Sequence, residues 1–212
     1  MTSTRKPRLL SALALVLMLP ITAVGQSAPP AAGAPAAGSA ARIFTIDPVH
    51  SGLKFEVEHL LVSSVSGRFN TFQGMIQLDP ANPGSSNVQV KIDASSINTE
   101  WNARDNDLRS ANFFDVAKFP ELTFKSTAVA QTAPGQLAVT GDFTMHGVTR
   151  SITIPVSQKG PVDGPKPGVQ VVGFKGTVTI KRSDFGMTRM VGPIGDEVAI
   201  TLNVEADANS AN

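Results

Sequence analysis

Residues 172–180 read VGFKGTVTI, and residues 198–204 read VAITLNV. In both stretches apolar side chains alternate with polar or small ones, which is the spacing of a β-strand that buries one face. The same period of two recurs in four shorter runs, which begin at Leu53, Val88, Leu137 and Ile152. Because almost all of residues 43–206 follow this pattern, the sequence predicts an all-β domain.

Turn signals separate these runs. They are Asp79-Pro80, Asn82-Pro83-Gly84, Ala133-Pro134-Gly135 and His146-Gly147, and the last has the length of a tight hairpin loop. A change of parity near Asn70-Thr71 indicates a bulge or bend. Consecutive hairpins favour an antiparallel meander, and long, bent strands tend to close into a barrel that has no exposed edges. We therefore expect one antiparallel β-barrel of roughly eight strands.

Residues 99–115 (TEWNARDNDLRSANFFD) lack the alternation. Arg104 and Asp107, like Asp105 and Arg109, have the spacing of ion pairs on a helix, so we expect a short helix near Ala103–Ser110. Surface ion pairs are favoured for these arginines over forked binding of a phosphate. Trp101 is expected in the core rather than as a platform for a ligand. Phe113 and Phe114 would help the helix to cap one end of the barrel.

The N-terminus has the features of an export signal. Arg5, Lys6 and Arg8 precede a leucine-rich apolar stretch, and Ala23-Val24-Gly25 supplies small residues at a cleavage site. The apolar run is shorter than the roughly 20 residues that span a bilayer comfortably, which disfavours the alternative of an uncleaved anchor. We expect residues 1–25 to be removed after Gly25 and the protein to be periplasmic.

The remaining chain divides into three parts. Residues 26–41 read QSAPPAAGAPAAGSAA and have nothing to bury, so they are expected to form a disordered linker. The folded domain should span residues 42–207, and residues 208–212 form a tail.

Composition excludes several kinds of function. The 212-residue chain has 18 basic and 17 acidic residues, a balance that offers no field for nucleic acid or for an anionic membrane surface. It has no cysteine, so thiolate nucleophiles and cysteine-type zinc sites are excluded. The sequence also lacks the motifs of phosphate loops, dinucleotide sites and serine nucleophiles. The carboxylates that could pair for acid–base catalysis are Glu56 with Glu58 and Asp105 with Asp107, and both pairs look like solvated faces. We expect no catalytic residues, no metal site, no cofactor and no enzyme activity.

The three histidines have separate interpretations. His146 should be exposed in its turn, and His50 should bond locally to Asp47 or Ser51. His59 continues the inward parity of Phe55 and Val57, so it is either a structural histidine or a contact for the polar head of a ligand near the barrel mouth.

The inward face supplies the candidate binding residues. Nine apolar side chains share inward parity on different strands: Phe55, Val57, Phe72, Ile92, Phe124, Phe143, Ile154, Phe174 and Val178. With His59 at the mouth and Phe113 and Phe114 at one end, they form the predicted lipid-binding set. Gly176 should leave room for a hydrocarbon. A barrel of this size either fills its interior with side chains or leaves a slot for a ligand.

Several ordered stretches resemble the YceI-like family. They include IDPVHS at residues 46–51, RDNDLRSANFFDV at 104–116, VTGDFTMHGVTR at 139–150 and RSDFG at 182–186. The resemblance spans essentially the whole of residues 43–206. It departs at Asn106-Asp107, where many relatives have a histidine, so a head-group role of that histidine is not carried over.

The resemblance implies a lipocalin-like barrel that holds a polyisoprenoid chain in an apolar interior. We therefore expect a periplasmic carrier whose partner is an isoprenoid lipid, of the polyprenyl or quinone type, without stable membrane insertion after processing. The alternative is a stress-related or interaction protein with a filled barrel. An exposed strand or the capping helix could support a homodimer.

Overall fold

The computed structural model describes residues 41–209. The predicted signal peptide and almost the whole predicted linker lie outside these residues. No helix in the described range is long and apolar enough to cross a membrane. The last strand continues to Asn209, so the first two residues of the predicted tail belong to the sheet.

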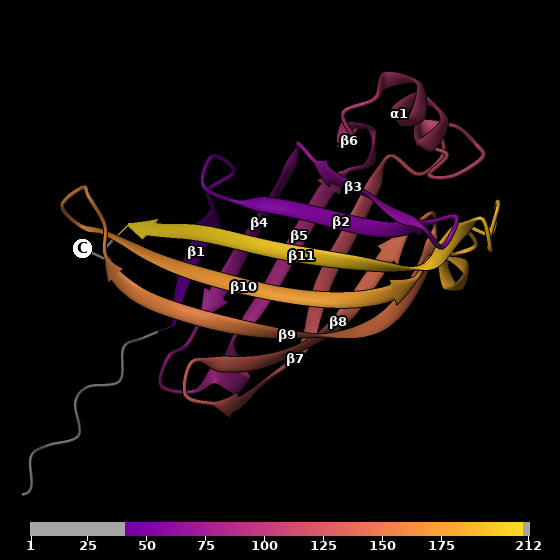
Figure 1. Ribbon diagram of the computed structural model, residues 1–212. Coiled ribbons are helices and arrows are strands. Elements are labelled where there is room, and N and C mark those ends of the chain that lie inside the picture. Colours follow the sequence, from indigo (N-terminus) through magenta and orange to yellow (C-terminus); the bar gives the residue numbers. More distant parts are fainter. Residues whose placement is uncertain (1–40, 210–212) are drawn as a thin grey trace, which may run out of the picture. The chain divides into compact units, whose positions relative to one another are not determined.

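Eight antiparallel strands form a closed barrel (Figure 1), as the alternating runs predict. In their order around the barrel they are β1 (Arg42–Ile46), β4 (Phe72–Leu78), β5 (Asn87–Asp93), β7 (Glu121–Ala133), β8 (Gln136–Met145), β9 (Val148–Asp163), β10 (Val169–Lys181) and β11 (Ile194–Asn209). The sheet closes through β1 and β11, where Thr45 faces Asp207 and Ile46 faces Ala206. This closure gives β1 a second neighbour beside β4, so β1 is not left as an exposed edge.

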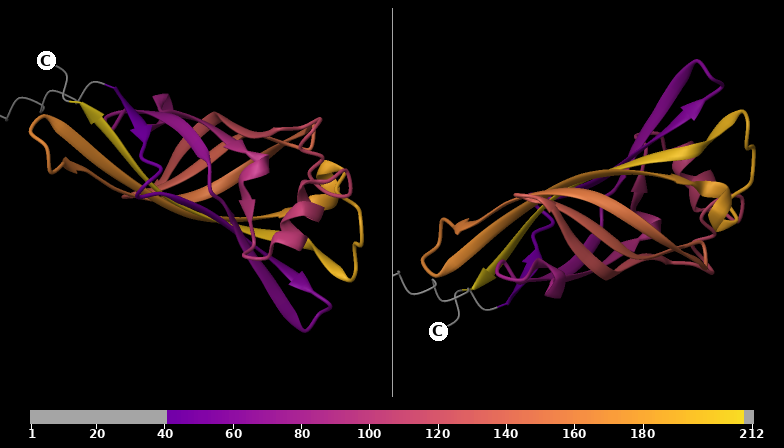
Figure 2. Two further views of the ribbon diagram at one scale, coloured as in Figure 1. Left: turned by 90° about the horizontal axis from the view of Figure 1, so that it is seen from above. Right: turned by 90° about the horizontal axis from the view of Figure 1, so that it is seen from below.

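Three further strands extend the sheet beyond β11: β2 (Gly52–His59), β3 (Ser63–Phe69) and the two-residue β6 (Ile97–Asn98). β2 pairs with β11 and with β3, and the β2–β3 hairpin projects from the barrel in both views of Figure 2. The parity change at Asn70-Thr71 is a bend, where the chain leaves β3 and enters β4.

The short helix is present, within one residue of its predicted bounds, as α1 (Asn102–Arg109). It lies beside β6 and the β2–β3 hairpin in Figure 1. Three 3-10 turns complete the described elements: η1 (Pro83–Ser85), η2 (Ala94–Ser96) and η3 (Arg182–Phe185). The predicted tight turn joins β8 to β9, with Met145 facing Val148 and both His146 and Gly147 at positive φ. Glycine adopts that conformation without strain.

The inward positions of the strands build the core. Along β10, Val172, Phe174 and Ile180 are buried, whereas Lys175 and Thr177 are exposed. The largest fully buried side chains are Phe44, Phe185, Ile97 and Val172. The alternation in the sequence thus marks the two faces of the sheet.

Candidate functional site: two apolar cavities in the barrel

The wider part of the barrel encloses a cavity of about 500 Å³, called the main cavity below. Its wall is apolar and comes from β2, β3, β11, the segment after α1 and the far side of the barrel. Cavities that bind small molecules occupy about 300–1,000 Å³ and are mostly apolar. The size and the lining of the main cavity therefore fit an apolar ligand.

A second, smaller space of about 110 Å³ lies in the barrel next to the main cavity and is called the inner cavity. It is lined by β1, β4, β5, β7, β8, β9, β10 and β11, and Leu53 lines both spaces. The two cavities are therefore neighbours along the barrel interior. This arrangement suits a long molecule better than a compact one.

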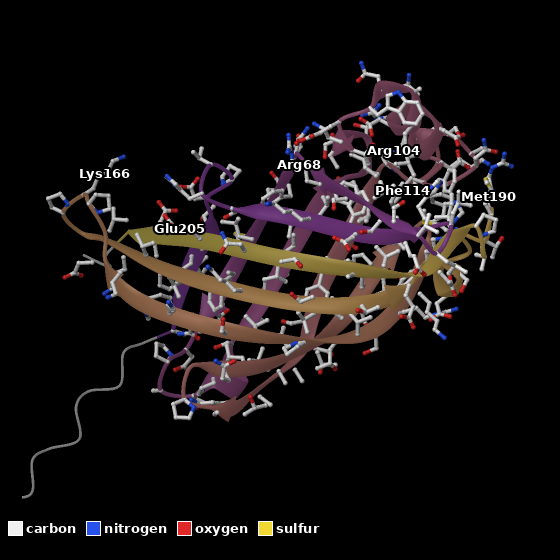
Figure 3. All side chains as sticks on the ribbon, in the orientation of Figure 1. Arg68, Arg104, Phe114, Lys166, Met190 and Glu205 are labelled. Carbon is white, nitrogen blue, oxygen red and sulfur yellow. The ribbon has the colours of Figure 1, made fainter. Side chains whose placement is uncertain are left out.

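Eleven of the twelve predicted residues line these cavities. The main cavity takes Phe55, Val57, His59, Ile92, Phe113, Phe114 and Phe143. The inner cavity takes Phe72, Phe124, Ile154 and Phe174. Phe114, labelled below the helix in Figure 3, packs edge-on against the ring of Phe69 on β3. Contact of these residues with a lipid stays a prediction.

Val178 and Gly176 differ from expectation. Val178 is half-buried and packs on the core, but it lines neither cavity. A Cβ on Gly176 would lie 2.7 Å from the backbone oxygen of Pro155. Gly176 therefore allows β9 and β10 to approach closely, and the expectation that it leaves room for a hydrocarbon is wrong.

The cavity mouth lies between the β2–β3 hairpin and α1. The exposed residues of the lining concentrate there, with Glu58, His59 and Ser63 on the hairpin side and Trp101 and Asp107 on the helix side. Trp101 is 61% exposed, so its predicted place in the core is wrong. The Arg104 guanidinium lies 5.4 Å from the centre of the indole ring, a distance typical of cation–π contact.

The helix is fixed by polar contacts to the main chain before it. Asp105 is buried and accepts hydrogen bonds from the backbone N–H and the hydroxyl of Thr99. Arg104 donates to the hydroxyl and the carbonyl of Thr99 at 2.7 and 2.8 Å. Asp105 is therefore not part of a solvated pair, and it anchors the first turn of α1 to the wall of the cavity.

Arg109 also reaches the main chain rather than an acid. Its Nε donates to the carbonyl of Ser95 and its Nη2 to that of Ile97, each at 2.7 Å. The predicted helical ion pairs are thus replaced by bonds to carbonyls. These carbonyls belong to a short turn and a two-residue strand, where ladder partners are few.

A buried arginine forms the opposite wall of the main cavity. Arg182 is 4% exposed, and it donates to the carbonyl oxygens of Met187, Arg189, Ile194 and Gly195 at 2.7–3.0 Å. Burial lowers the pKa of Arg182, and the charge of Asp196 opposes that shift. The four bonds hold the loop between η3 and β11 against the barrel.

The histidines occupy three environments. His59 is exposed at the mouth, in the place that its parity predicts. His146 is half-buried against Phe119 and its Nδ1 lies 3.2 Å from the carbonyl of Phe185, so the expectation of an exposed turn residue is wrong. His50 bonds to Asp47 as predicted, with 2.6 Å between Nδ1 and Oδ2.

Glu205 approaches the same imidazole from β11, with its Oε1 3.7 Å from Nδ1 of His50. The hydrogen bond with Asp47 raises the pKa of His50, and the charges of Asp47 and Glu205 act in the same direction. Asp47, His50 and Glu205 offer ligand atoms within 4.8 Å of one another on the outer surface. Glu205 is 155 positions from His50, so local spacing does not reveal this group.

Sequence reasoning missed several wall residues. Val198 and Ile200 line the main cavity from β11, and their place in an alternating run was a sufficient signal. Met187 comes from an irregular loop and Arg182 from a 3-10 turn, where no periodicity indicates which way a side chain points. Nothing in the local sequence distinguishes a buried arginine from an exposed one.

Fold and cavities together define an antiparallel barrel with an apolar interior able to enclose a ligand. The model of the YceI-like domain matches residues 44–206, and the chain belongs to this family. A relative from Shewanella sp. strain ANA-3, described as a UPF0312 protein, is 38% identical over 173 residues, which cover 81% of this chain and 90% of the relative.

Several solved structures share the fold, among them the following two. Burkholderia cenocepacia BcnA has a TM-score of 0.66 and 25% identity, covering 76% of this chain and 98% of that protein. A domain from Saccharophagus degradans, described as polyisoprenoid-binding and implicated in plant cell wall breakdown, has a TM-score of 0.61 and 19% identity, covering 78% and 98% of the two chains. At that identity the second likeness concerns the fold alone.

Proposed function

We propose that this protein is an exported, periplasmic binding protein that carries a long-chain isoprenoid lipid in its barrel. The observation that carries the proposal is the main cavity, a mostly apolar space of about 500 Å³ that adjoins a second apolar space in the barrel. The export signal predicted from the sequence of residues 1–25 supports this location.

The chemistry of the lining favours a hydrocarbon chain. Each buried CH₂ group stabilises a complex by about 0.8 kcal/mol, so a long branched chain gains affinity from length alone. Phenylalanine and aliphatic side chains dominate both walls, whereas the polar groups concentrate at the mouth. A lipid would therefore enter tail first and leave its head near His59 and Trp101.

The rival function is an interaction protein with a filled barrel. A filled interior would leave no room for a ligand, and the volume of the main cavity favours the carrier instead. The proposed role is binding, and it assigns no catalytic step to any residue.

Mass spectrometry of an organic extract of the purified protein tests the proposal. We expect an isoprenoid lipid in the extract, or its uptake by stripped protein when it is supplied in detergent. A protein that yields no lipid and takes up none would contradict the carrier function and leave the rival as the better explanation.

A further inference from the structure

Two neighbouring loops at the mouth of the main cavity carry an unusual surface. They join β2 to β3 and η3 to β11. Leu60, Leu61, Val62, Met190 and Val191 on these loops are exposed, and together they are called the apolar tip. Half of the exposed large apolar side chains of residues 41–209 lie in this one place, with Leu61 77% and Val62 82% exposed. Such a concentration marks an interaction surface, whereas single exposed apolar residues do not.

The loops are held in this arrangement. The backbone N–H of Leu60 donates to the carbonyl of Pro193 at 2.8 Å, which ties one loop to the other. The second loop is fixed from below by Arg182, which donates to the carbonyl of Arg189. These hydrogen bonds therefore hold the two loops in the conformation that exposes the side chains of the apolar tip.

The backbone carries strain at the same residues. Leu60, Leu61 and Met190 have φ values of 55°, 61° and 53°. This left-handed region is uncommon for residues other than glycine, and it costs of order 1 kcal/mol or more at each position. Strain that presents apolar side chains to solvent indicates a use for them.

The composition of the apolar tip points to the chemistry of its partner. The exposed side chain of Arg189 lies next to Met190 on the second loop, and the acidic residues Glu58, Asp184 and Asp196 come before or after the two loops rather than within them. Apolar side chains on a projecting tip suit a phospholipid bilayer, where they enter the acyl boundary and an adjacent arginine can meet phosphate groups.

The position of the apolar tip agrees with that partner. His59 and Ser63 flank Leu60–Val62 in the sequence and also line the main cavity. Met190 lies at the end of the barrel opposite Lys166 (Figure 3). A second copy of this chain is the less suitable partner, because a stable interface buries roughly 800 Å² on each side and the apolar tip offers five side chains on two projecting loops.

We propose that the apolar tip docks reversibly on a phospholipid bilayer, so that a lipid passes between the membrane and the main cavity without crossing water. This inference rests on the proposed function, since it assigns the tip to the loading and release of the carried lipid. The rest of the barrel stays outside the bilayer.

A site-specific label can test the docking. The chain has no cysteine, so Leu61→Cys, Met190→Cys and the control Val162→Cys each accept one environment-sensitive fluorophore. Val162 is also exposed and lies on β9, near the loop that contains Lys166. With phosphatidylcholine–phosphatidylglycerol vesicles, we expect a blue shift and quenching by lipid-attached quenchers at positions 61 and 190 only. Because each label reports its own surroundings, the apolar N-terminal stretch does not produce this signal.

A pair of double variants measures the strength of docking. Leu61→Ser with Met190→Ser should weaken vesicle binding about tenfold or more, because each change removes an apolar side chain that docking would transfer from water into the bilayer. Val49→Ser with Val162→Ser removes equally exposed apolar side chains elsewhere and should leave binding unchanged. Thermal unfolding of both variants should match that of the unchanged protein.

The outcomes separate the two proposals. Labels at 61 and 190 that stay in water while the purified protein retains its lipid overturn the docking and leave the carrier function intact. Inserted labels on a protein that takes up no lipid overturn the carrier function instead. A blue shift that appears without vesicles and rises with protein concentration, together with dimers in sedimentation, identifies a second copy as the occupant and overturns the docking.

Discussion

The ring of Phe55 on β2 lies against Gly67, its cross-strand partner on β3, in the space that a Cβ at Gly67 would need. From there a row of aromatic rings continues. The centre of the Phe55 ring is 5.9 Å from that of Phe69, which is 5.8 Å from that of Phe114 in an edge-on arrangement. The glycine lets the ring lie close to the sheet, and this keeps space free in the main cavity.

Replacing Gly67 should therefore reduce lipid binding. In Gly67→Ala the new methyl group forces the Phe55 ring away from β3 and into the main cavity, at a cost of about 1–3 kcal/mol in the free energy of unfolding. Lipid content by mass spectrometry and unfolding in urea measure the two effects. The control is Gly52→Ala, because a Cβ at Gly52 has no neighbour within 4 Å. Equal lipid content in both variants would show that the ring does not limit the cavity.

A larger side chain on the wall should block binding directly. Ile200→Trp places an indole in the main cavity, whereas Thr201→Trp places the same group on the exposed face of β11. We expect the first variant to fold and to lose most of its lipid, and the second to keep it. Uptake of a fluorescent isoprenoid by stripped protein provides the measurement. Full uptake by a folded Ile200→Trp variant would place the binding site elsewhere.

Arg182 should contribute strongly to stability. Arg182→Met leaves the carbonyls of Met187, Arg189, Ile194 and Gly195 without their donor, so we expect a loss of at least about 3 kcal/mol in the free energy of unfolding. Arg182→Lys keeps a charge but cannot reach four carbonyls, and it should recover only part of the loss. Arg150→Met is the control, since Arg150 is exposed. A urea midpoint equal to that of the control would refute this role.

The His50–Asp47 pair should titrate in a defined window. The hydrogen bond and charge of Asp47 raise the pKa of His50 above its ordinary value of 6.5, so the stabilisation is present below 6.5 and is lost as pH rises through the raised value. The same bond lowers the pKa of Asp47 below 3.8, so the carboxylate's contribution is lost as pH falls through that lowered value. The His50–Asp47 pair therefore stabilises the fold most between pH 3.8 and 6.5, where the carboxylate and the imidazolium are both charged.

Proton NMR of the imidazole measures this effect. We expect a titration midpoint above 6.5 for His50 that moves down in Asp47→Asn and, by less, in Glu205→Gln. The resonance is assigned by its disappearance in His50→Gln. A midpoint that does not respond to Asp47→Asn would contradict the assignment of the main cause.

Local patterns in the sequence predict the fold because each alternating run forms a strand and each turn signal joins neighbouring strands. The alternation at residues 172–180 and 198–204 separates wall from surface, and the two-residue turn at His146-Gly147 fixes the register of β8 and β9. The same alternation places nine of the eleven predicted wall residues on the cavity walls, whereas Phe113 and Phe114 come from the segment after α1 that lacks it. Gly176 was misread because parity gives the direction of a side chain and not the distance to the next strand.

The other errors concern long-range contacts. Helical spacing pairs Arg109 with Asp105, but in the fold Arg109 meets the carbonyls of Ser95 and Ile97. Burial of Arg182 and the approach of Glu205 to His50 likewise depend on loops that only the complete barrel brings together. Contacts between residues far apart in the sequence are therefore the part of the site that local patterns do not predict.

The two sides of β3 are hydrogen-bonded to different extents, so the β2–β3 hairpin should be more mobile than the barrel strands. β3 pairs with β2 along its length, but on its other side only Arg68 and Phe69 pair with a strand within residues 41–209. The barrel strands β7 to β10 have neighbours on both sides. Local opening follows the lowest density of such bonds, so the outer amides of β3 should exchange with deuterium well before those of β8 and β9. The β2–β3 hairpin should therefore open locally about its pairing with β11. This part of the wall of the main cavity then moves while the eight barrel strands stay folded.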